Sequence, residues 1–269
     1  MVKPRRHLVI PDQQCKPGVA SEQVEWIARF AIEKTPDVIV IIGDWADMPS
    51  LSSYDVGLKS FEGRTYRADI LAANDALQRF MTPVQAEVER RRKNHKPRWE
   101  PRIICTLGNH ENRINVAIEK DRKLDGLISV DDLFFKQWGI EVHPFLKPVV
   151  VDGVVYCHYF CSGVMGRPIT TAKSLLTKLH QSCFAGHQQE RDIAYGKRAD
   201  GSRVTAIIAG CGYLHDESYL NDQTNNVWRG VYVLNEVENG AFDEMPVSLR
   251  FLKERYGEET QEVEAAGRL

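Results

Sequence analysis

The sequence lacks any long hydrophobic run. Its longest fully aliphatic stretch, Val38–Ile42, has five residues, whereas a membrane-spanning helix needs about 20. The basic start, MVKPRRHLVIPD, contains no apolar stretch long enough for a secretory signal. We therefore expect a cytoplasmic protein that has no membrane partner.

The sequence also lacks a dominant sign of charge. Its 35 lysines and arginines nearly balance its 37 aspartates and glutamates, which gives a formal net charge of −2. This balance argues against a protein whose whole surface binds nucleic acid or anionic lipid. A local basic patch is compatible with it.

Paired cysteine motifs are absent as well. The six cysteines include no Cys-x-x-Cys pair, and most of them lie in apolar sequence. This pattern is typical of buried, reduced thiols, so we expect neither disulfides nor a thiolate zinc site. We also find no internal repeat and no low-complexity tract.

Strands and helices alternate in the first part of the chain. His7–Ile10 predicts a short strand, and the apolar residues between Ser21 and Lys34 fall on one face of a helix that Ser21 caps. The run DVIVIIGD, from Asp37 to Asp44, predicts a strand covered on both faces. This alternation predicts an α/β fold, and we expect one domain over residues 1–257.

Residues 48–100 differ in character and predict an insertion made of a loop and a long helix. The helix ends in six basic residues between Arg90 and Arg98, which either form a solvated helix end or contact a phosphate-rich substrate. Tyr54, Tyr66 and Trp99 are available for stacking on a substrate or for packing.

The second half of the chain predicts mainly strands. Pro148–Val151 and Val154–His158 form a hairpin across Asp152-Gly153, and a terminal hairpin turns near Asn239-Gly240. Further elements are a helix over 170–180, a strand before Gly186 and a strand over 204–209. The acidic tail over 258–269 is expected to be frayed or disordered.

Polar residues follow five of the predicted strands, including one predicted by the apolar run RIICTL over Arg102–Leu107. They are Asp12 and Gln14; Gly43, Asp44 and Asp47; Gly108, Asn109, His110 and Glu111; His158; and Gly186, His187 and Gln189. Each cluster offers an oxygen or an imidazole nitrogen, which are ligands for divalent metal ions. The glycines permit tight turns and a close approach of the backbone.

The order of these clusters, D-x-Q, GDxxD, GNHE, H and GHxQ, resembles the calcineurin-like metallophosphoesterase superfamily, whose usual pattern is D-x-H, GDxxD, GNH[ED], H and GHxH. The match runs from Asp12 to Gln189, and GDWAD and LGNHENR are its most specific parts. The resemblance implies a four-layer αββα sandwich of two mixed β-sheets flanked by helices. It also implies a metal site at the strand ends and a helical cap over residues 48–100.

The resemblance further implies a role for each polar residue. Asp44 would bridge two divalent ions, His110 would stabilise or protonate the leaving oxygen, and Asp47 would orient His110. Asn109, His158 and His187 would complete the shell of one ion, and Asp12, Gln14 and Gln189 would face the other. Arg113 and His215 are candidates for substrate binding, against the alternatives of a surface arginine and a loop histidine.

The chain departs from the superfamily pattern at Gln14 and Gln189, which stand where histidines are usual. Both changes concern ligands of the same ion. The site of that ion then has only oxygen donors, whereas the site of the other ion keeps two imidazoles. Oxygen donors favour Mn²⁺ or Mg²⁺, with Ca²⁺ next, over zinc or iron. Because a neutral amide is a weak ligand, we expect this first site to be loosely occupied and activity to depend on added Mn²⁺.

The expected reaction is hydrolysis of a phosphoester by a metal-activated water. Nucleotides and nucleic-acid ends are the preferred substrates, which would make the protein a phosphodiesterase. A phosphomonoesterase acting on protein or small-molecule phosphate is the close variant. The alternative from another class is a non-catalytic scaffold of the same fold that binds a protein.

Overall fold

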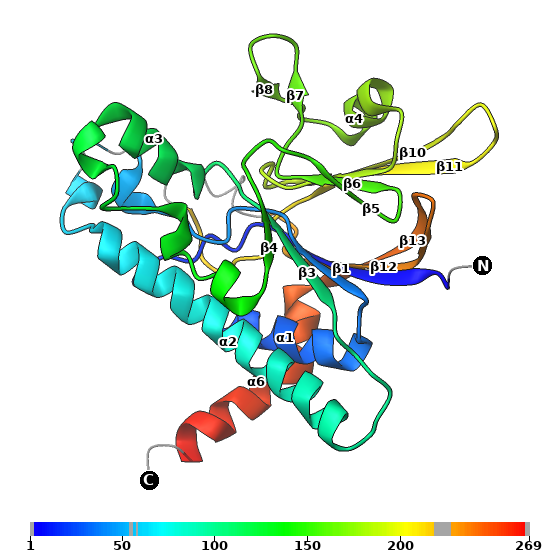
Figure 1. The fold of residues 1–269 in the computed structure, drawn as a ribbon, viewed down its shortest axis with the longest axis horizontal. Coiled ribbons are helices and arrows are strands. Elements are labelled where there is room, and N and C mark those ends of the chain that lie inside the picture. Colours follow the sequence, from blue (N-terminus) through cyan, green and yellow to red (C-terminus); the bar gives the residue numbers. More distant parts are fainter. Residues whose placement is uncertain (1–2, 54–55, 58, 218–226, 267–269) are drawn as a thin grey trace.

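The computed structural model describes residues 3–53, 56–57, 59–217 and 227–266. Two mixed β-sheets pack against each other, and helices cover their outer faces (Figure 1). The predicted α/β sandwich is therefore confirmed. Within the described residues, no helix is long and apolar enough to cross a membrane.

The first sheet has six strands in the order β13-β12-β1-β2-β3-β4. Neighbouring strands from β1 to β4 are parallel, whereas β12 and β13 add antiparallel to the β1 edge. The strands are β1 (Arg5–Ile10), β2 (Val38–Ile41), β3 (Arg102–Thr106), β4 (Glu141–His143), β12 (Gly230–Glu238) and β13 (Ala241–Ser248). The predicted terminal hairpin is β12 and β13.

The second sheet has five strands in the order β10-β11-β9-β6-β5. Its central strands β6, β9 and β11 are parallel, and its outer strands β5 and β10 are antiparallel to them. The strands are β5 (Val149–Val151), β6 (Val154–Cys157), β9 (Cys183–Ala185), β10 (Arg191–Lys197) and β11 (Arg203–Ala209). A separate small hairpin joins β7 (Cys161–Ser162) and β8 (Arg167–Pro168).

The helices complete four layers. In Figure 1, α1, α2 and α6 lie below the first sheet and α4 lies above the second, with α3 at one side. The α-helices are α1 (Gln23–Lys34), α2 (Tyr66–Lys93), α3 (Asn112–Lys120), α4 (Ala172–Leu179) and α6 (Leu249–Ala266), and short 3₁₀ turns span Pro49–Leu51, Lys59–Phe61, Arg122–Leu124, Val130–Asp132 and Lys136–Trp138. Each helix that covers a sheet buries one apolar face against it.

Strand β2 shows why the sequence forms this sandwich. Val38, Val40 and Ile42 pack into the core between the two sheets, whereas Ile39 and Ile41 pack against the helices on the other side. All five side chains are fully buried. Successive residues of a strand point to opposite faces, so a strand covered on both faces reads as one continuous apolar run.

One local prediction needs correction. Ser21 does not cap α1, whose N-cap is Glu22 without a side-chain cap bond; instead the Ser21 hydroxyl accepts a hydrogen bond from Arg79. Helix α6 extends to Ala266 and so includes most of the acidic stretch over 258–269, whose fraying stays a prediction.

Most of the cysteines are buried, as the sequence predicts. All six cysteines are free. Five of them are buried, and Cys161 on β7 is the exposed one. Burial raises the pKa of the Cys15, Cys183 and Cys211 thiols to about 12.

The insertion over residues 48–100 divides into two parts. Its helix, α2, packs in the core against α1, and Trp99 is buried and donates a hydrogen bond to the carbonyl of Pro36. The basic run lies at the end of α2, where Arg90 and Arg91 pair with Glu87. These contacts favour packing for Trp99 and a helix end for the basic run. Tyr54 lies outside the described residues.

Candidate metal centre

Strand ends from both sheets bring the candidate ligands together. Asp12 follows β1, Asp44 follows β2, Asn109 follows β3, and His158 and His187 follow β6 and β9 of the second sheet. The carboxyl ends of parallel strands lie at one edge of a sheet, where loops from several strands meet. One ligand atom from each of Asp44, His158 and His187 lies within 4.8 Å of the others, so this cluster could hold a metal ion.

The lone pairs around His158 fit a cation. The Nδ1–H of His158 donates to the carbonyl of Ile42 at 2.9 Å, which leaves Nε2 with a lone pair in the neutral ring. That Nε2 lies 3.2 Å from Asp44 Oδ2 and 2.9 Å from Asn109 Oδ1, both of which are acceptors. Three acceptors that face one another require a proton or a metal ion between them.

The pKa values of the candidate ligands also favour a positive charge beside Asp44. Burial opposes a charged imidazole, but Asp44 outweighs it and raises the pKa of His158 to about 10. Burial likewise opposes ionisation of Asp44, but His110 and His158 hold its pKa well below the usual range. Burial lowers the pKa of His187 to about 4, so this ring is neutral and available as a ligand.

Asn109 links the two imidazoles. Its Oδ1 lies 2.9 Å from His158 Nε2 and 2.8 Å from His187 Nδ1. The amide oxygen therefore sits beside the ring nitrogens that would face the ion. Asp44, Asn109, His158 and His187 together form a mixed oxygen and nitrogen set, which suits zinc, iron or manganese.

Asp12 and Gln189 lie together at a second point, and Gln14 follows Asp12 in the same loop. Asp12 is fully buried, and its carboxylate accepts hydrogen bonds from the backbone N–H of His187 and from Nε2 of Gln189. Burial raises the pKa of Asp12 to about 7, and the nearby Asp44 adds to this although His158 opposes it. Two close carboxylates in a buried site are stabilised when a cation lies between them.

The amide oxygens of two glutamines give a second indication of a bound cation. The Oε1 atoms of Gln14 and Gln189 are buried and have no hydrogen-bond partner among the described residues. Buried polar atoms are almost always satisfied, so each such oxygen needs an explanation. A metal ion held by oxygen donors is one that fits both amides and the adjacent Asp12 carboxylate.

Three of the candidate ligands have a strained backbone. Gln14, Asp44 and His187 have φ values of 44°, 49° and 68°, in the left-handed region that residues other than glycine rarely adopt. Each such residue costs free energy and persists because its surroundings enforce it. The three residues come from three different loops, and the Gln14 N–H donates to the carbonyl of Asp44 at 2.8 Å, which joins two of these loops.

Glu111 holds these loops together. Its carboxylate is fully buried and accepts hydrogen bonds from the backbone N–H groups of Asp44 at 3.0 Å, Ala46 at 2.9 Å and Gly108 at 2.8 Å. The loop after β2 is thereby fastened to the loop after β3. The sequence placed Glu111 in the polar cluster after β3, but only the structure shows this positioning role.

His110 and Asp47 form a dyad beside the metal ligands. The Nδ1–H of His110 donates to Asp47 Oδ1 at 2.7 Å, and Nε2 lies 3.7 Å from Asp44 Oδ2. Burial disfavours the imidazolium, but Asp44 and Asp47 outweigh it and raise the pKa of His110. Arg113 donates to the backbone carbonyl of Asp47 at 2.7 Å, and its Nη2 lies 3.3 Å from His110 Nε2, so it lies in the site.

Sequence reasoning did not single out Lys16 or Glu217. Lys16 Nζ lies 3.0 Å from Asp47 Oδ2 and 2.7 Å from Glu217 Oε1, and Glu217 is buried. His215 binds Glu217 Oε1 at 2.6 Å and stacks on Tyr213 instead of lining the cleft. Lys16 stands two residues after Gln14, and this closeness in sequence is the signal that could have identified it.

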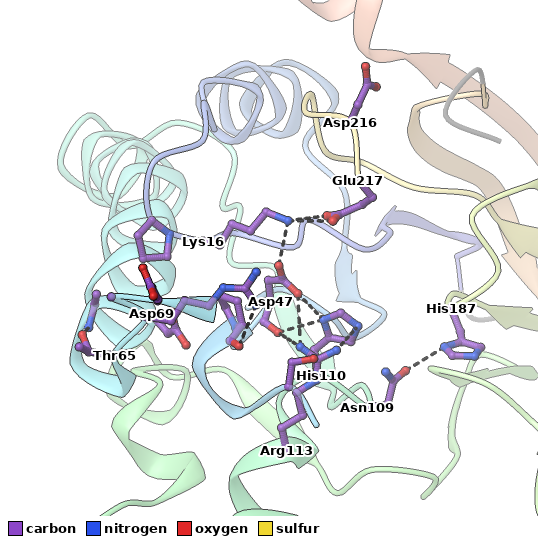
Figure 2. A pocket seen from close by; sticks show the side chains of 17 residues that line it. Lys16, Asp47, Thr65, Asp69, Asn109, His110, Arg113, His187, Asp216 and Glu217 are labelled. Atoms are coloured by element: carbon purple, nitrogen blue, oxygen red, sulfur yellow. Dashed lines mark hydrogen bonds and ion pairs between the residues drawn. The ribbon is translucent and has the colours of Figure 1, made fainter. Parts of the chain in front are cut away.

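A cleft of about 830 Å³ opens beside the candidate ligands (Figure 2). Figure 2 shows Asn109 and His187 on one side of the dyad, with Asp69 and Thr65 of the α2 region on the other. The cleft is lined by Lys16, Pro17, Asp47, Pro49, Ser52, Glu62, Gly63, Arg64, Thr65, Ala68, Asp69, Asn109, His110, Arg113, His187, Asp216 and Glu217. The first part of the 48–100 insertion therefore forms one wall of it.

Comparison with known proteins assigns no family to the chain. A scan against family models and a search of curated proteins both found no match. The functional interpretation therefore depends on the residues and the geometry described above.

Proposed function

We propose that this protein is a metal-dependent phosphoester hydrolase. The observation that supports the proposal is the convergence of Asp44, His158 and His187 beside the His110–Asp47 dyad, at the wall of one cleft. A metal-ligand cluster next to a proton donor provides the two elements that hydrolysis of a phosphoester requires. The motif order seen in the sequence supports the same proposal.

The metal ligands, His110 and Asp47 have separate roles in the proposed reaction. A divalent cation at these ligands would polarise a phosphoryl oxygen and lower the pKa of a coordinated water. His110 gives the proton at Nε2 to the leaving oxygen, and Asp47 fixes the ring by accepting from Nδ1–H. The raised pKa of His110 favours the protonated ring that this step uses.

The proposal includes two ions with different preferences. Asp44, Asn109, His158 and His187 would hold one ion through mixed donors, and Asp12, Gln14 and Gln189 would hold the other through oxygen alone, with Asp44 shared. The orphaned amide oxygens support the second, weaker site. Oxygen donors favour Mn²⁺ or Mg²⁺ there, so activity should depend on added Mn²⁺.

The preferred reaction is that of a phosphodiesterase, with nucleotides or nucleic-acid ends as the first substrates to test. The cleft continues from the dyad to the wall formed by Thr65 and Asp69, which leaves room for a second substituent on phosphorus. A phosphomonoesterase is the close variant, and generic diester and monoester substrates separate the two.

The first experiment is a metal titration with hydrolysis of a generic phosphodiester as the readout. We expect activity that Mn²⁺ restores after chelation and that His110→Ala abolishes, with the exposed His95→Ala as the control. Full activity after exhaustive chelation would contradict the metal mechanism. A protein that binds Mn²⁺ but hydrolyses no phosphoester would instead be a scaffold.

A second experiment tests the two glutamines directly. Gln14→His with Gln189→His replaces two neutral amide ligands by imidazoles, so Mn²⁺ and Zn²⁺ should bind more tightly. Calorimetric titration of the purified protein measures this without any substrate. Unchanged affinities would show that these side chains do not face the ion.

A further inference from the structure

A row of charged side chains leads away from the dyad into the wall of the cleft. Figure 2 shows Glu217 joined to Lys16, Lys16 joined to Asp47, and Asp47 joined to His110. The separations are 2.7 Å from Lys16 Nζ to Glu217 Oε1, 3.0 Å to Asp47 Oδ2, and 2.7 Å from Asp47 Oδ1 to His110 Nδ1. Four separate loops contribute to the row, those after β1, β2, β3 and β11.

These charges are almost completely removed from water. The exposed fractions of the side chains are 16% for Lys16, 9% for Asp47 and 5% for Glu217. Burying ion pairs is costly and often stabilises a fold less than apolar packing would, so such a row is weak evidence for a purely stabilising role. Its position against a proposed proton donor suggests a role in the reaction.

The two oxygens of Asp47 have different partners. Oδ1 accepts from His110 and lies 3.5 Å from Arg113 Nη1, and Oδ2 binds Lys16. Because the terminal torsion of an aspartate is broad, a carboxylate that loses the partner of one oxygen can turn. Lys16 therefore helps to fix the plane of the carboxylate. This plane, together with the Asp47 carbonyl 3.0 Å from Nδ1, sets the direction in which His110 Nε2 faces the cleft.

Lys16 is itself held from the other side. Glu217 binds Nζ through both oxygens, at 2.7 and 2.9 Å, and His215 binds Glu217 Oε1 at 2.6 Å. The ring of His215 stacks on Tyr213 with 4.6 Å between centroids. A long, flexible lysine side chain is thus confined to one place between two carboxylates.

We propose that Lys16 is a positioning residue for the proton donor of the reaction, and that Glu217 holds Lys16 in place. This inference rests on the proposed phosphoester hydrolysis. In the step concerned, the bond from phosphorus to the leaving oxygen breaks and the Nε2 proton of His110 moves to that oxygen. The attacking water supplies the new oxygen on phosphorus and releases its proton to solvent.

The dependence on the leaving group distinguishes this role from a structural one. An alkoxide leaves poorly without a proton, whereas p-nitrophenolate leaves well without one. A residue that only orients the proton donor should therefore matter for alkyl leaving groups and matter little for p-nitrophenol. A residue that stabilises the fold or binds the phosphate should affect all substrates alike.

The experiment compares the wild type with Lys16→Met, Lys16→Arg and the surface control Lys197→Met, on diesters whose leaving groups run from p-nitrophenol through phenol to an alkyl alcohol. For Lys16→Met we expect kcat to fall about 100-fold with the alkyl leaving group, within the range for proton transfer, and by less than about threefold with p-nitrophenol. KM should not change. Lys16→Arg should restore most of the loss, because Arg can bind both carboxylates.

A second variant and a second measurement guard against misfolding. Lys16→Met leaves Asp47 and Glu217 facing each other, so Lys16→Met with Glu217→Gln removes the repulsion and should show the same leaving-group dependence. In metal-free protein, the His110 Nδ1–H proton should exchange slowly with water in the wild type and rapidly in both variants, as observed by NMR.

The outcomes separate the two proposals. Equal losses of kcat with every leaving group, or a rise in KM alone, would overturn the role of Lys16 and leave the hydrolase proposal standing. A wild-type protein that hydrolyses none of the diesters with Mn²⁺ would overturn both. A slowly exchanging His110 proton that persists in Lys16→Met would also contradict the positioning role.

Discussion

Glu111 offers a test of the site that does not depend on any assumed reaction. Its carboxylate is the acceptor for three backbone N–H groups, from Asp44, Ala46 and Gly108. Replacing Glu111 by alanine removes that acceptor and leaves the three donors buried. The perturbation therefore acts on the backbone that places Asp44, without touching a candidate ligand.

The size of the effect follows from the number of donors. A buried donor left without a partner costs about 1–3 kcal/mol, so the three together cost about 3–9 kcal/mol. A typical domain is stable by about 5–15 kcal/mol, so Glu111→Ala should lose about half of the stability or more. Glu111→Gln keeps one acceptor oxygen and loses the bond to Ala46, which gives about 1–3 kcal/mol.

One opposing effect lowers the loss of stability expected for Glu111→Gln. Burial and the neighbouring Asp44 raise the pKa of Glu111, so the charge is itself unfavourable in the folded protein. An amide at this position removes the repulsion and recovers part of the lost free energy. We therefore expect Glu111→Gln near the lower end of its range, clearly less harmful than Glu111→Ala.

Urea denaturation monitored by tryptophan fluorescence measures the free energy of unfolding of both variants. Glu89→Gln, at a half-exposed position of α2, is the control. The expected order of stability is wild type and control, then Glu111→Gln, then Glu111→Ala. A loss below about 1 kcal/mol for Glu111→Ala would refute the reasoning, because at least one buried donor costs that much.

Two further predictions concern other parts of the fold. Burial lowers the pKa of His7, which lies between Tyr156 and Asp152, below its ordinary 6.5, so the unfolded chain binds the proton more tightly and stability is lost as the pH falls below 6.5. His7→Gln should flatten this loss in denaturation curves recorded at several pH values, and an unchanged pH dependence would contradict it. A Cβ on Gly108 would lie 2.0 Å from Asp44 Oδ1, so Gly108→Ala should abolish the rise in Tm that we expect from Mn²⁺. The control Gly126→Ala strains a backbone with φ of +79° but its Cβ meets nothing within 4 Å, so it should lower Tm and keep the rise.

Patterns that repeat along the chain could be predicted from the sequence. The apolar run over 38–42 forms β2 and its continuation, and the Asp152-Gly153 and Asn239-Gly240 turns join β5 to β6 and β12 to β13. These elements depend on periodicity and on turn residues that act locally. The candidate ligands could be found for a related reason, since each directly follows a strand.

Contacts between distant residues could not be predicted in this way. Lys16 and Glu217 are 201 residues apart, and neither stands in a motif that marks it as a partner of Asp47. Strand β10 (Arg191–Lys197) was missed because its residues are mixed in polarity and half-exposed at the sheet edge, which gives no strong period. Serine is a residue type that often caps a helix N-terminus, but the hydroxyl of Ser21 accepts a hydrogen bond from Arg79 of α2 instead.

The two glutamines bear on the choice between an enzyme and a scaffold. Gln14 comes from the loop after β1 in the first sheet and Gln189 from the loop after β9 in the second, yet both offer a buried carbonyl oxygen that no described donor satisfies. A fold that had lost its metal would be stabilised by turning these amides or by placing an N–H group opposite them, because an unsatisfied buried acceptor is costly. Neither has happened, although Nε2 of Gln189 is anchored on Asp12. A cation bound to these amide oxygens would offset the cost at both positions, which favours the metal-dependent enzyme over the scaffold.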